Sequence, residues 1–372
     1  MRQFKDGPET NNRNLNQYWI YWARESAAKG YKRSLNMTFP DQDGNVYDDA
    51  YNLTMTNRRD SDIKLHQTVN DAIRNSRFNF STRWCPDSHG YGTKLESDQF
   101  HLTRLLSNKF KFNETDSGDK ARKGNFVTWV VSNCNKTLGA KQRFDYAQEL
   151  IQNGLKLDGY GKCFDKEITN LKKADGLQKM LLALSKYKFY LAFENGIHCK
   201  DYLSEKFWRN SLEAELVPIV FGTHPQDVKE LAPPNSYIHV EDFKGSNGSK
   251  DLVDYLNYLN ENDTAYMEYH QWRINIKPDL SKPLYGIEEK KDCGTCQLLK
   301  EKRKQNYPKR MIRSVCSWWW LNTHDDLCIN MTAMPEYFRN IYPPVSMSDN
   351  YFEEFRLGFF GRMMRFVRRY LF

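Results

Sequence analysis

The fold is decided by residues 188–222, which read KFYLAFENGIHCKDYLSEKFWRNSLEAELVPIVFG. Lys188–Phe193 is a short aromatic and aliphatic run and predicts a buried strand. After a polar turn, a helix is expected to begin near Ser204, and Leu216–Phe221 predicts a second strand that ends at Gly222. Two strands joined by a helix predict a right-handed crossover and a parallel strand pair.

The alternation of strand and helix begins well before this stretch. The elements expected there are a strand at 126–131, a helix with residues 144, 147, 150 and 151 on its inner face and Asn153-Gly154 at its end, a strand at 155–160 and a helix at 177–184. Two further strands are expected at 18–22 and 51–56. The pattern predicts an α/β fold with a doubly wound parallel sheet, and such sheets bind ligands at the carboxyl ends of their strands. This rule points to Ser132-Asn133, Glu194-Asn195 and the helix start at Ser204.

The composition is that of a folded protein suited to an anionic ligand. The chain has 372 residues, 40% of them hydrophobic and 14% aromatic, enough for two cores. It has no apolar stretch of about 18 residues, as a membrane span needs, and residues 1–16 lack the apolar core of a signal peptide. The net charge of +8 is spread along the sequence, which suits nucleotide phosphates and does not point to nucleic acid as a partner.

Acceptor sites of the type Asn-x-Ser/Thr indicate a secretory-pathway protein. Eight are present, against roughly three expected by chance, although an Asn-rich chain can also collect them by accident. They begin at Asn36, Asn52, Asn79, Asn113, Asn135, Asn247, Asn262 and Asn330.

The cysteines allow three interpretations. Eight are present, and the spacing of the late group at Cys293, Cys296, Cys316 and Cys328 permits zinc, redox chemistry or disulfides. Together with the Asn-x-Ser/Thr sites, structural disulfides are the favoured interpretation. Their connectivity cannot be read from the sequence.

The expected helix start after the second loop offers an anion site. Ser204 is a good N-cap, and the free amides and partial positive charge of a helix N-terminus attract a diphosphate. Lys206 would add positive charge there. Taken as isolated residues, Glu205 and Lys206 have the alternative interpretation of a solvated surface pair.

The order of residues in this loop closely resembles the donor-binding signature of the α-1,3-fucosyltransferase family. That signature is usually Phe-Glu-Asn-Ser, a short spacer and Asp-Tyr-Ile/Val-Thr-Glu-Lys, and it is similar to Phe193–Gly196 followed by Asp201–Lys206. The spacer is one residue longer here, and Gly196 stands where the family more often has serine. Further resemblances, in the family's order, are Ala23–Ser26, Tyr51–Ile63, Val130–Asn133 with Arg143, and Leu216–Gly222.

The resemblance implies a GT-B fold of two Rossmann-like domains and an inverting, single-displacement transfer of fucose from GDP-fucose. The expected divisions are 1–122 for a partial acceptor-side domain, 123–290 for the GDP-fucose-binding domain and 291–372 for a cysteine-containing segment with a basic aromatic tail. Full-length family members are type II membrane proteins of the Golgi lumen. The anchor is absent from this sequence, and the N-terminal domain is expected to be incomplete.

The resemblance also assigns roles to single residues. Glu25 would be the general base, and Glu205 would stabilise positive charge on the fucosyl group. The donor-binding residues implied are Arg143, Asn195, Tyr202, Lys206, Ser132 and Asn133. Because cationic side chains would neutralise the diphosphate, neither a metal nor a cofactor is expected, and Asp60-Ser61-Asp62 is expected to make structural hydrogen bonds.

Some residues keep an open assignment. Arg58 and Arg59 either face the cleft or form surface salt bridges. His198 and Cys199 lie in the variable spacer and receive no role. The acceptor implied is the 3-hydroxyl of a GlcNAc residue in a glycoprotein or glycolipid glycan. The competing hypothesis is a truncated, inactive pseudoenzyme that binds a sugar nucleotide or a glycan.

Overall fold

The computed structural model describes residues 18–23, 25, 26, 51–64, 68–77, 126–136, 138–169, 175–277 and 279, together with residues 299, 300, 304 and 328. All of these residues belong to one compact unit of the chain, 1–329. In chain order, its strands are β1 (Ile20–Trp22), β2 (Leu53–Thr56), β3 (Ile63–Lys64), β4 (Val127–Val130), β5 (Leu157–Tyr160), β6 (Phe189–Phe193), β7 (Val217–Phe221) and β8 (Ile238–His239). Its helices are α2 (Val69–Arg77), α4 (Leu138–Gln152), α5 (Gly176–Leu184), η2 (Trp208–Glu213), α6 (Pro225–Leu231), η3 (Val240–Asp242), α7 (Gly248–Glu261), α8 (Asp263–Glu268) and α9 (Trp272–Asn275).

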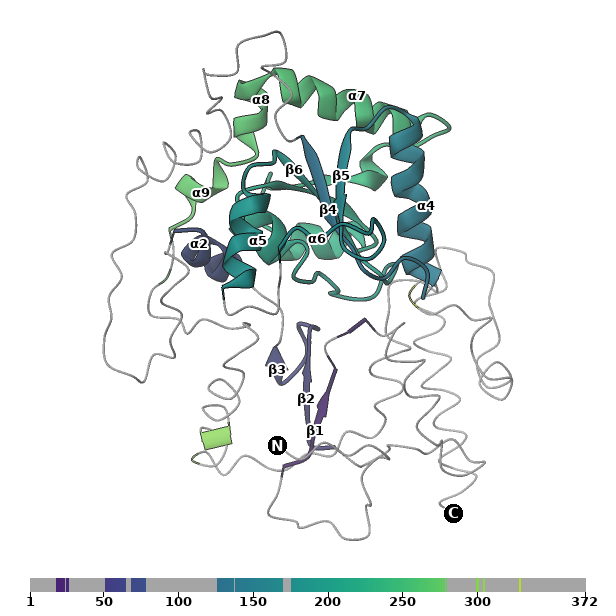
Figure 1. Ribbon diagram of the computed structural model, residues 1–372. Helices are drawn as coiled ribbons and strands as arrows, with labels where there is room; N and C mark the ends of the chain where they lie inside the picture. Colours follow the sequence, from purple (N-terminus) through teal and green to yellow (C-terminus); the bar gives the residue numbers. More distant parts are fainter. Residues whose placement is uncertain are drawn as a thin grey trace. The chain divides into compact units, whose positions relative to one another are not determined.

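A five-stranded parallel sheet is the main framework of the described residues (Figure 1). Its strand order is β5-β4-β6-β7-β8, and every neighbouring pair is parallel. The steps from β4 to β5 and from β5 to β6 run in opposite directions across the sheet, so right-handed crossovers place α4 and α5 on opposite faces. In agreement, α4 packs against α7, whereas α5 packs against η2. The predicted α/β class and parallel sheet are confirmed.

Strand β6 forms the centre of the core because all of its side chains are buried. It lies between β4 and β7, and helices cover both faces of the sheet, so no position of the strand faces water. Trp129 of β4 packs edge-on against Phe193, with 5.7 Å between the ring centroids. The absence of polar alternation in this part of the sequence therefore reflects a central strand, as predicted.

Helix α4 ends in the way that the sequence predicts. Gly154 has a φ of +96°, in the left-handed region that glycine tolerates best. Leu155 N donates to Leu150 O at 2.9 Å and Gly154 N donates to Ile151 O at 3.0 Å, the paired bonds of a glycine C-cap. The chain is thereby turned directly into β5.

The helix expected near Ser204 differs in type and in starting point. Residues 205–207 form turns, and the regular element is η2, a π-helix that begins only at Trp208. Leu212 N donates to Phe207 O at 3.1 Å, a spacing of five residues instead of four. Phe207 and Trp208, where this wider turn begins, are both buried. Their rings meet edge to face, with 5.0 Å between the centroids.

A second, smaller sheet is formed by β1, β2 and β3, all parallel, in that order. Ile20 pairs with Leu53 and Trp22 with Met55. The strands predicted at 18–22 and 51–56 are therefore confirmed, with shorter bounds. Within the described ranges, no helix has the length and apolar character needed to cross a bilayer.

The described Asn-x-Ser/Thr sites differ in burial. Asn135 and Asn247 are exposed, whereas Asn52 is buried and its Oδ1 accepts a hydrogen bond from Trp19 N at 3.0 Å. In folded protein from a glycosylating host, we expect glycans on Asn135 and Asn247 and none on Asn52, because a glycan on Asn52 would displace the packing of β1 on β2. Glycopeptide mass spectrometry reads each site. Glycosylated Asn52 in the folded fraction would contradict this expectation.

Candidate active site

The loops that follow β4, β6 and β7 meet at the carboxyl edge of the five-stranded sheet. Arg143 of α4 bridges the first two loops, because its guanidinium donates to Phe193 O at 2.6 Å and to Asn133 O at 2.9 Å. Glu194 N donates to Phe221 O at 2.9 Å, and this bond joins the loop after β6 to the loop after β7. The strand-end rule therefore pointed to residues that the fold does bring together.

Arg143 contributes a buried positive charge to this edge. Its guanidinium lies over the Trp129 ring at 5.7 Å from the centroid. Burial lowers the pKa of Arg143, and the negative charge of Glu194 partly offsets this effect. An arginine remains a cation even so. Its Nε is buried and has no hydrogen-bond partner among the described atoms.

Lys206 lies between two carboxylates in the loop that follows β6. Its Nζ is 3.0 Å from Glu194 Oε2, 3.2 Å from Glu205 Oε1 and 2.8 Å from Ser204 Oγ. Its side chain is 14% exposed, and Glu194 is fully buried. Burial disfavours the charged ammonium, but Glu194 and Glu205 outweigh burial and raise the pKa of Lys206. Arg143 is close enough to lower it in turn, so the two cations lie within electrostatic range of each other.

Glu205 is the part of this cluster that reaches the surface, with 45% of its side chain exposed. Desolvation by neighbouring protein atoms would raise its pKa, but the charges of Lys206 and Arg209 prevail and lower the pKa of Glu205 to about 2. The carboxylate is therefore ionised throughout the neutral range. Such a group suits stabilisation of a positive charge and does not suit proton uptake at neutral pH.

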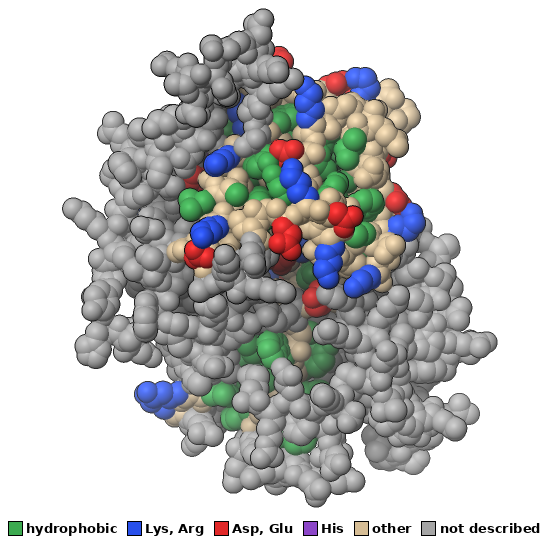
Figure 2. Space-filling view, in the orientation of Figure 1, with side chains coloured by type: hydrophobic (Ala, Val, Ile, Leu, Met, Phe, Trp, Pro, Cys, Tyr) green, Lys and Arg blue, Asp and Glu red, His purple; other side chains and the backbone are tan. Residues whose placement is uncertain are grey.

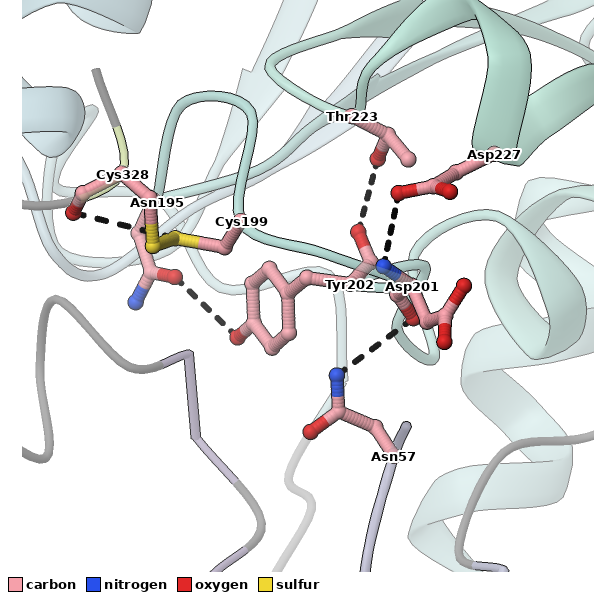
Figure 3. The surroundings of a disulfide bond; sticks show 8 residues. All are labelled: Asn57, Asn195, Cys199, Asp201, Tyr202, Thr223, Asp227 and Cys328. Carbon is pink, nitrogen blue, oxygen red and sulfur yellow. Dashed lines mark hydrogen bonds between the residues drawn. A yellow bond between two sulfur atoms is a disulfide. The ribbon is translucent and has the colours of Figure 1, made fainter. Parts of the chain in front are cut away.

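Tyr202 is held in place from two sides (Figure 3). Its hydroxyl donates to Asn195 Oδ1 at 3.1 Å, and its backbone O accepts a hydrogen bond from Thr223 Oγ1 at 2.7 Å. Burial raises the pKa of Tyr202 well above its usual value, against the opposing effect of Lys206. The phenol is therefore protonated and fixes the rotamer of Asn195.

Ser132 and Asn133 follow β4 and have mainly local contacts. Ser132 is exposed, and its Oγ accepts a hydrogen bond from Lys162 N at 3.4 Å. Asn133 is half-buried, and its Oδ1 accepts from Lys136 N at 3.0 Å. The structure places both at the carboxyl edge, beside Arg143.

Glu25 and Ser26 reach the same loop from the small sheet. Ser26 is buried, and a Cβ added at Gly196 would lie 2.8 Å from Ser26 Oγ and 2.9 Å from Cys199 Sγ. A residue with a side chain at position 196 would require Ser26 or Cys199 to shift, and glycine avoids this. Glu25 is half-buried, and its negative charge is among the causes that raise the pKa of Tyr202. Glu25 therefore lies within electrostatic range of the loop.

Arg58 and Arg59 are both paired with carboxylates. Arg58 Nε donates to Asp60 Oδ1 at 2.8 Å. Arg59 Nε donates to Asp201 Oδ1 at 2.6 Å. Asp62 Oδ2 accepts from Thr54 N at 2.9 Å, so Asp60 and Asp62 do have the structural hydrogen bonds that were expected.

Two disulfides fix loops of the site. They join Cys134 to Cys163 and Cys199 to Cys328, with Cα separations of 5.6 Å and 4.5 Å. Cys199, which received no role from the sequence, therefore holds the spacer of the signature. The predicted disulfides are present, whereas Cys293, Cys296 and Cys316 lie outside the described residues.

The prediction that the N-terminus of a helix at Ser204 forms the anion site is wrong. Ser204 N donates to Glu194 Oε1 at 2.8 Å and Lys206 N donates to Ser204 Oγ at 3.4 Å, so protein atoms already occupy these amides. The helix itself begins later, at Trp208. Positive charge at the loop comes instead from the side chains of Lys206 and Arg143.

Charge elsewhere is dispersed. Figure 2 shows acidic and basic side chains interspersed over the described face, without a basic block. Among the described residues, no group of three or more His, Cys, Asp or Glu side chains is arranged to hold a metal ion.

Several residues that organise the loop received no role from the sequence. Glu194, Asp201, Thr223 and Asp227 are all buried, and each receives or makes a hydrogen bond that shapes the loop. The strand-end rule pointed to Glu194, but it did not predict the ion pair of Glu194 with Lys206. Asp227 could not be found from the sequence, because its partners lie in other elements.

Two protein families match this chain, and one of the two matches covers the site. The family described as Glycosyltransferase family 10 (fucosyltransferase) C-term matches residues 120–318, and that described as Fucosyltransferase, N-terminal matches residues 1–67. The first of these matches contains Arg143 and the whole loop from Glu194 to Lys206.

Two curated relatives illustrate the similarity. The chain is 40% identical over 266 residues to a human 4-galactosyl-N-acetylglucosaminide 3-alpha-L-fucosyltransferase, covering 72% of this chain and 56% of the relative. It is 31% identical over 305 residues to a 3-galactosyl-N-acetylglucosaminide 4-alpha-L-fucosyltransferase of Bos taurus, covering 82% of this chain and 63% of the relative. The chain thus spans between about half and two thirds of the length of these relatives.

Proposed function

Because the chain belongs to glycosyltransferase family 10, the fucosyltransferase family, we propose that it transfers fucose from GDP-fucose to the 3-hydroxyl of a GlcNAc residue in a glycoprotein or glycolipid glycan. The observation that carries the proposal is the Lys206 ammonium, held by Glu194 and Glu205 within electrostatic range of Arg143. Two cations at the carboxyl edge of a parallel sheet suit a nucleotide diphosphate.

The proposed reaction is a single displacement with inversion. The acceptor oxygen forms a bond to C1 of fucose while the bond from C1 to the β-phosphate oxygen breaks. The acceptor proton passes to Glu25, and the electron pair of the broken bond leaves with GDP. Lys206 and Arg143 stabilise the charge that develops on the diphosphate, so that side chains supply what a metal ion supplies in other transferases.

Glu205 stabilises the opposite charge in this proposal. As the bond to GDP lengthens, the fucosyl ring becomes oxocarbenium-like, and an ionised carboxylate beside it lowers the barrier. A pKa of about 2 supports that role. Asn195, Tyr202, Ser132 and Asn133 form the remaining donor contacts, with Asn195 oriented by the Tyr202 hydroxyl.

The proposal extends to architecture and location. We assign the five-stranded sheet to a GDP-fucose-binding domain at 123–290, preceded by a partial acceptor-side domain at 1–122 in a GT-B arrangement and followed by the segment 291–372. The two disulfides support assembly in an oxidising compartment, in agreement with a Golgi lumenal enzyme.

The test is transfer from radiolabelled GDP-fucose to N-acetyllactosamine and to chitobiose-core acceptors, with GDP binding measured in parallel by calorimetry. We expect labelled product with at least one acceptor, and persistence of activity in a metal chelator. Linkage analysis of the product by NMR reports whether the 3-hydroxyl is used and whether the anomeric configuration inverts. GDP binding without transfer to either acceptor would favour the pseudoenzyme, and absence of both would reject the proposal.

A further inference from the structure

Asp201 has a left-handed backbone conformation, which aspartate adopts more readily than most residues other than glycine. Its φ is +57°, in the left-handed region, where a residue other than glycine needs support from its surroundings. Its backbone N donates to Asp227 Oδ2 at 2.7 Å, and its backbone O accepts a hydrogen bond from Asn57 Nδ2 at 3.4 Å (Figure 3). The loop directly before Tyr202 is therefore fixed by contacts from outside itself.

Arg59 joins two buried carboxylates at this point. Its Nε is 2.6 Å from Asp201 Oδ1 and one of its terminal nitrogens is 3.2 Å from Asp227 Oδ1, while the other terminal nitrogen pairs with Glu230. The side chains of Asp201 and Asp227 are 1% and 0% exposed, and that of Arg59 is 33% exposed. Two buried carboxylates are costly without a cation, and the planar fork of a guanidinium can hold both at once.

The other end of this contact lies in the small sheet. Arg59 follows β2, which pairs in parallel with β1. Ala23 N donates to Met55 O at 3.1 Å, which continues the pairing toward Glu25. Arg59 and the proposed base Glu25 therefore both lie in segments that follow strands of the small sheet, whereas Asp201 belongs to the loop of the donor residues.

We propose that Arg59 is a positioning residue. Through Asp201 and Asp227 it holds the small sheet, and with it Glu25, in register with the loop at 195–206. This inference rests on the proposed function, because the register matters only if Glu25 acts on an acceptor beside the donor. The hydrogen bonds of the Lys206 side chain go to Glu194, Glu205 and Ser204, so Arg59 does not contact the ammonium that would bind the diphosphate.

The test compares Arg59→Lys, which keeps the charge and loses the fork, with Arg59→Gln, which loses both. We expect kcat for transfer to fall about 10-fold in the first and about 100-fold in the second, because misplacement of a catalytic group by about 1 Å can cost that much. The Kd for GDP is expected to stay within about 3-fold of the unsubstituted value in both. Lys250→Gln, which removes an exposed ion pair with Asp254, is the control and leaves both quantities unchanged.

A second measurement does not depend on activity. Hydrogen–deuterium exchange of the peptide 18–23, which contains β1, is expected to rise without ligand in both Arg59 variants and not in Lys250→Gln. Arg59→Lys keeps the test informative should Arg59→Gln fail to fold. Unchanged exchange, or a GDP Kd that weakens in parallel with kcat, overturns the inference. An unsubstituted chain that transfers no fucose rejects the proposed function, and the exchange result still decides whether Arg59 holds the small sheet in place.

Discussion

Lys206→Met is expected to lower kcat/KM for fucose transfer by about 100- to 1,000-fold, the range seen when a charge-stabilising group is removed from a transition state. The ammonium is held by Glu194, Glu205 and Ser204, so its charge is fixed before any donor binds. Without the ammonium, the buried Glu194 carboxylate loses this cation, and its negative charge would repel a diphosphate. Steady-state kinetics over a range of GDP-fucose concentrations measures the effect.

The control for this substitution is Lys250→Met. Lys250 lies on α7 in an exposed pair with Asp254, and its removal should leave kcat/KM unchanged. Glu194→Gln tests the charge of Glu194 while its place in the loop is kept. Glutamine still offers an oxygen to Ser204 N, but one of the two carboxylates beside Lys206 is removed. Full activity in Lys206→Met, with the fold intact by circular dichroism, would refute the assignment of Lys206.

Glu25→Gln is expected to lower kcat by about 100-fold or more, while GDP binding remains as it was, because loss of a general base removes only the step that activates the acceptor. Glu25 is half-buried and lies within electrostatic range of Tyr202, but it reaches the site from a different sheet than the donor residues. Calorimetry with GDP and initial rates with saturating acceptor measure the two quantities separately.

Glu167→Gln provides the comparison for Glu25, because Glu167 is an exposed carboxylate. It should behave like the unsubstituted chain. If Glu25→Gln retained its kcat, the base would have to be another group, and the Arg59 substitutions would no longer be expected to act through Glu25.

The parts of the fold that could be predicted are those with local causes. The run at 188–193 has no polar residue after Lys188, and only a strand covered on both faces needs that composition. Gly154 marks the end of α4 because the C-cap needs a left-handed residue. In both cases the signal and the structure lie within a few residues of each other.

The parts that could not be predicted depend on distant partners. The π-helix that begins at Trp208 has no signal in helical propensity, which does not distinguish a hydrogen-bond spacing of five residues from one of four. The pairing of Cys199 with Cys328 bridges 129 positions of the sequence. The cluster at Arg59 draws its carboxylates from two other elements, so the sequence left open whether Arg59 faces a cleft or forms an ion pair.

The crowding at Gly196 ties three parts of the chain together. A side chain introduced at 196 would come within 2.8 Å of Ser26 and 2.9 Å of Cys199 Sγ, so Gly196→Ser is expected to displace the loop. Ser26→Gly would relieve only the first of these contacts, because Cys199 is held by its disulfide to Cys328. Changes at this one glycine are therefore transmitted both to the segment that carries Glu25 and to the disulfide that anchors the spacer.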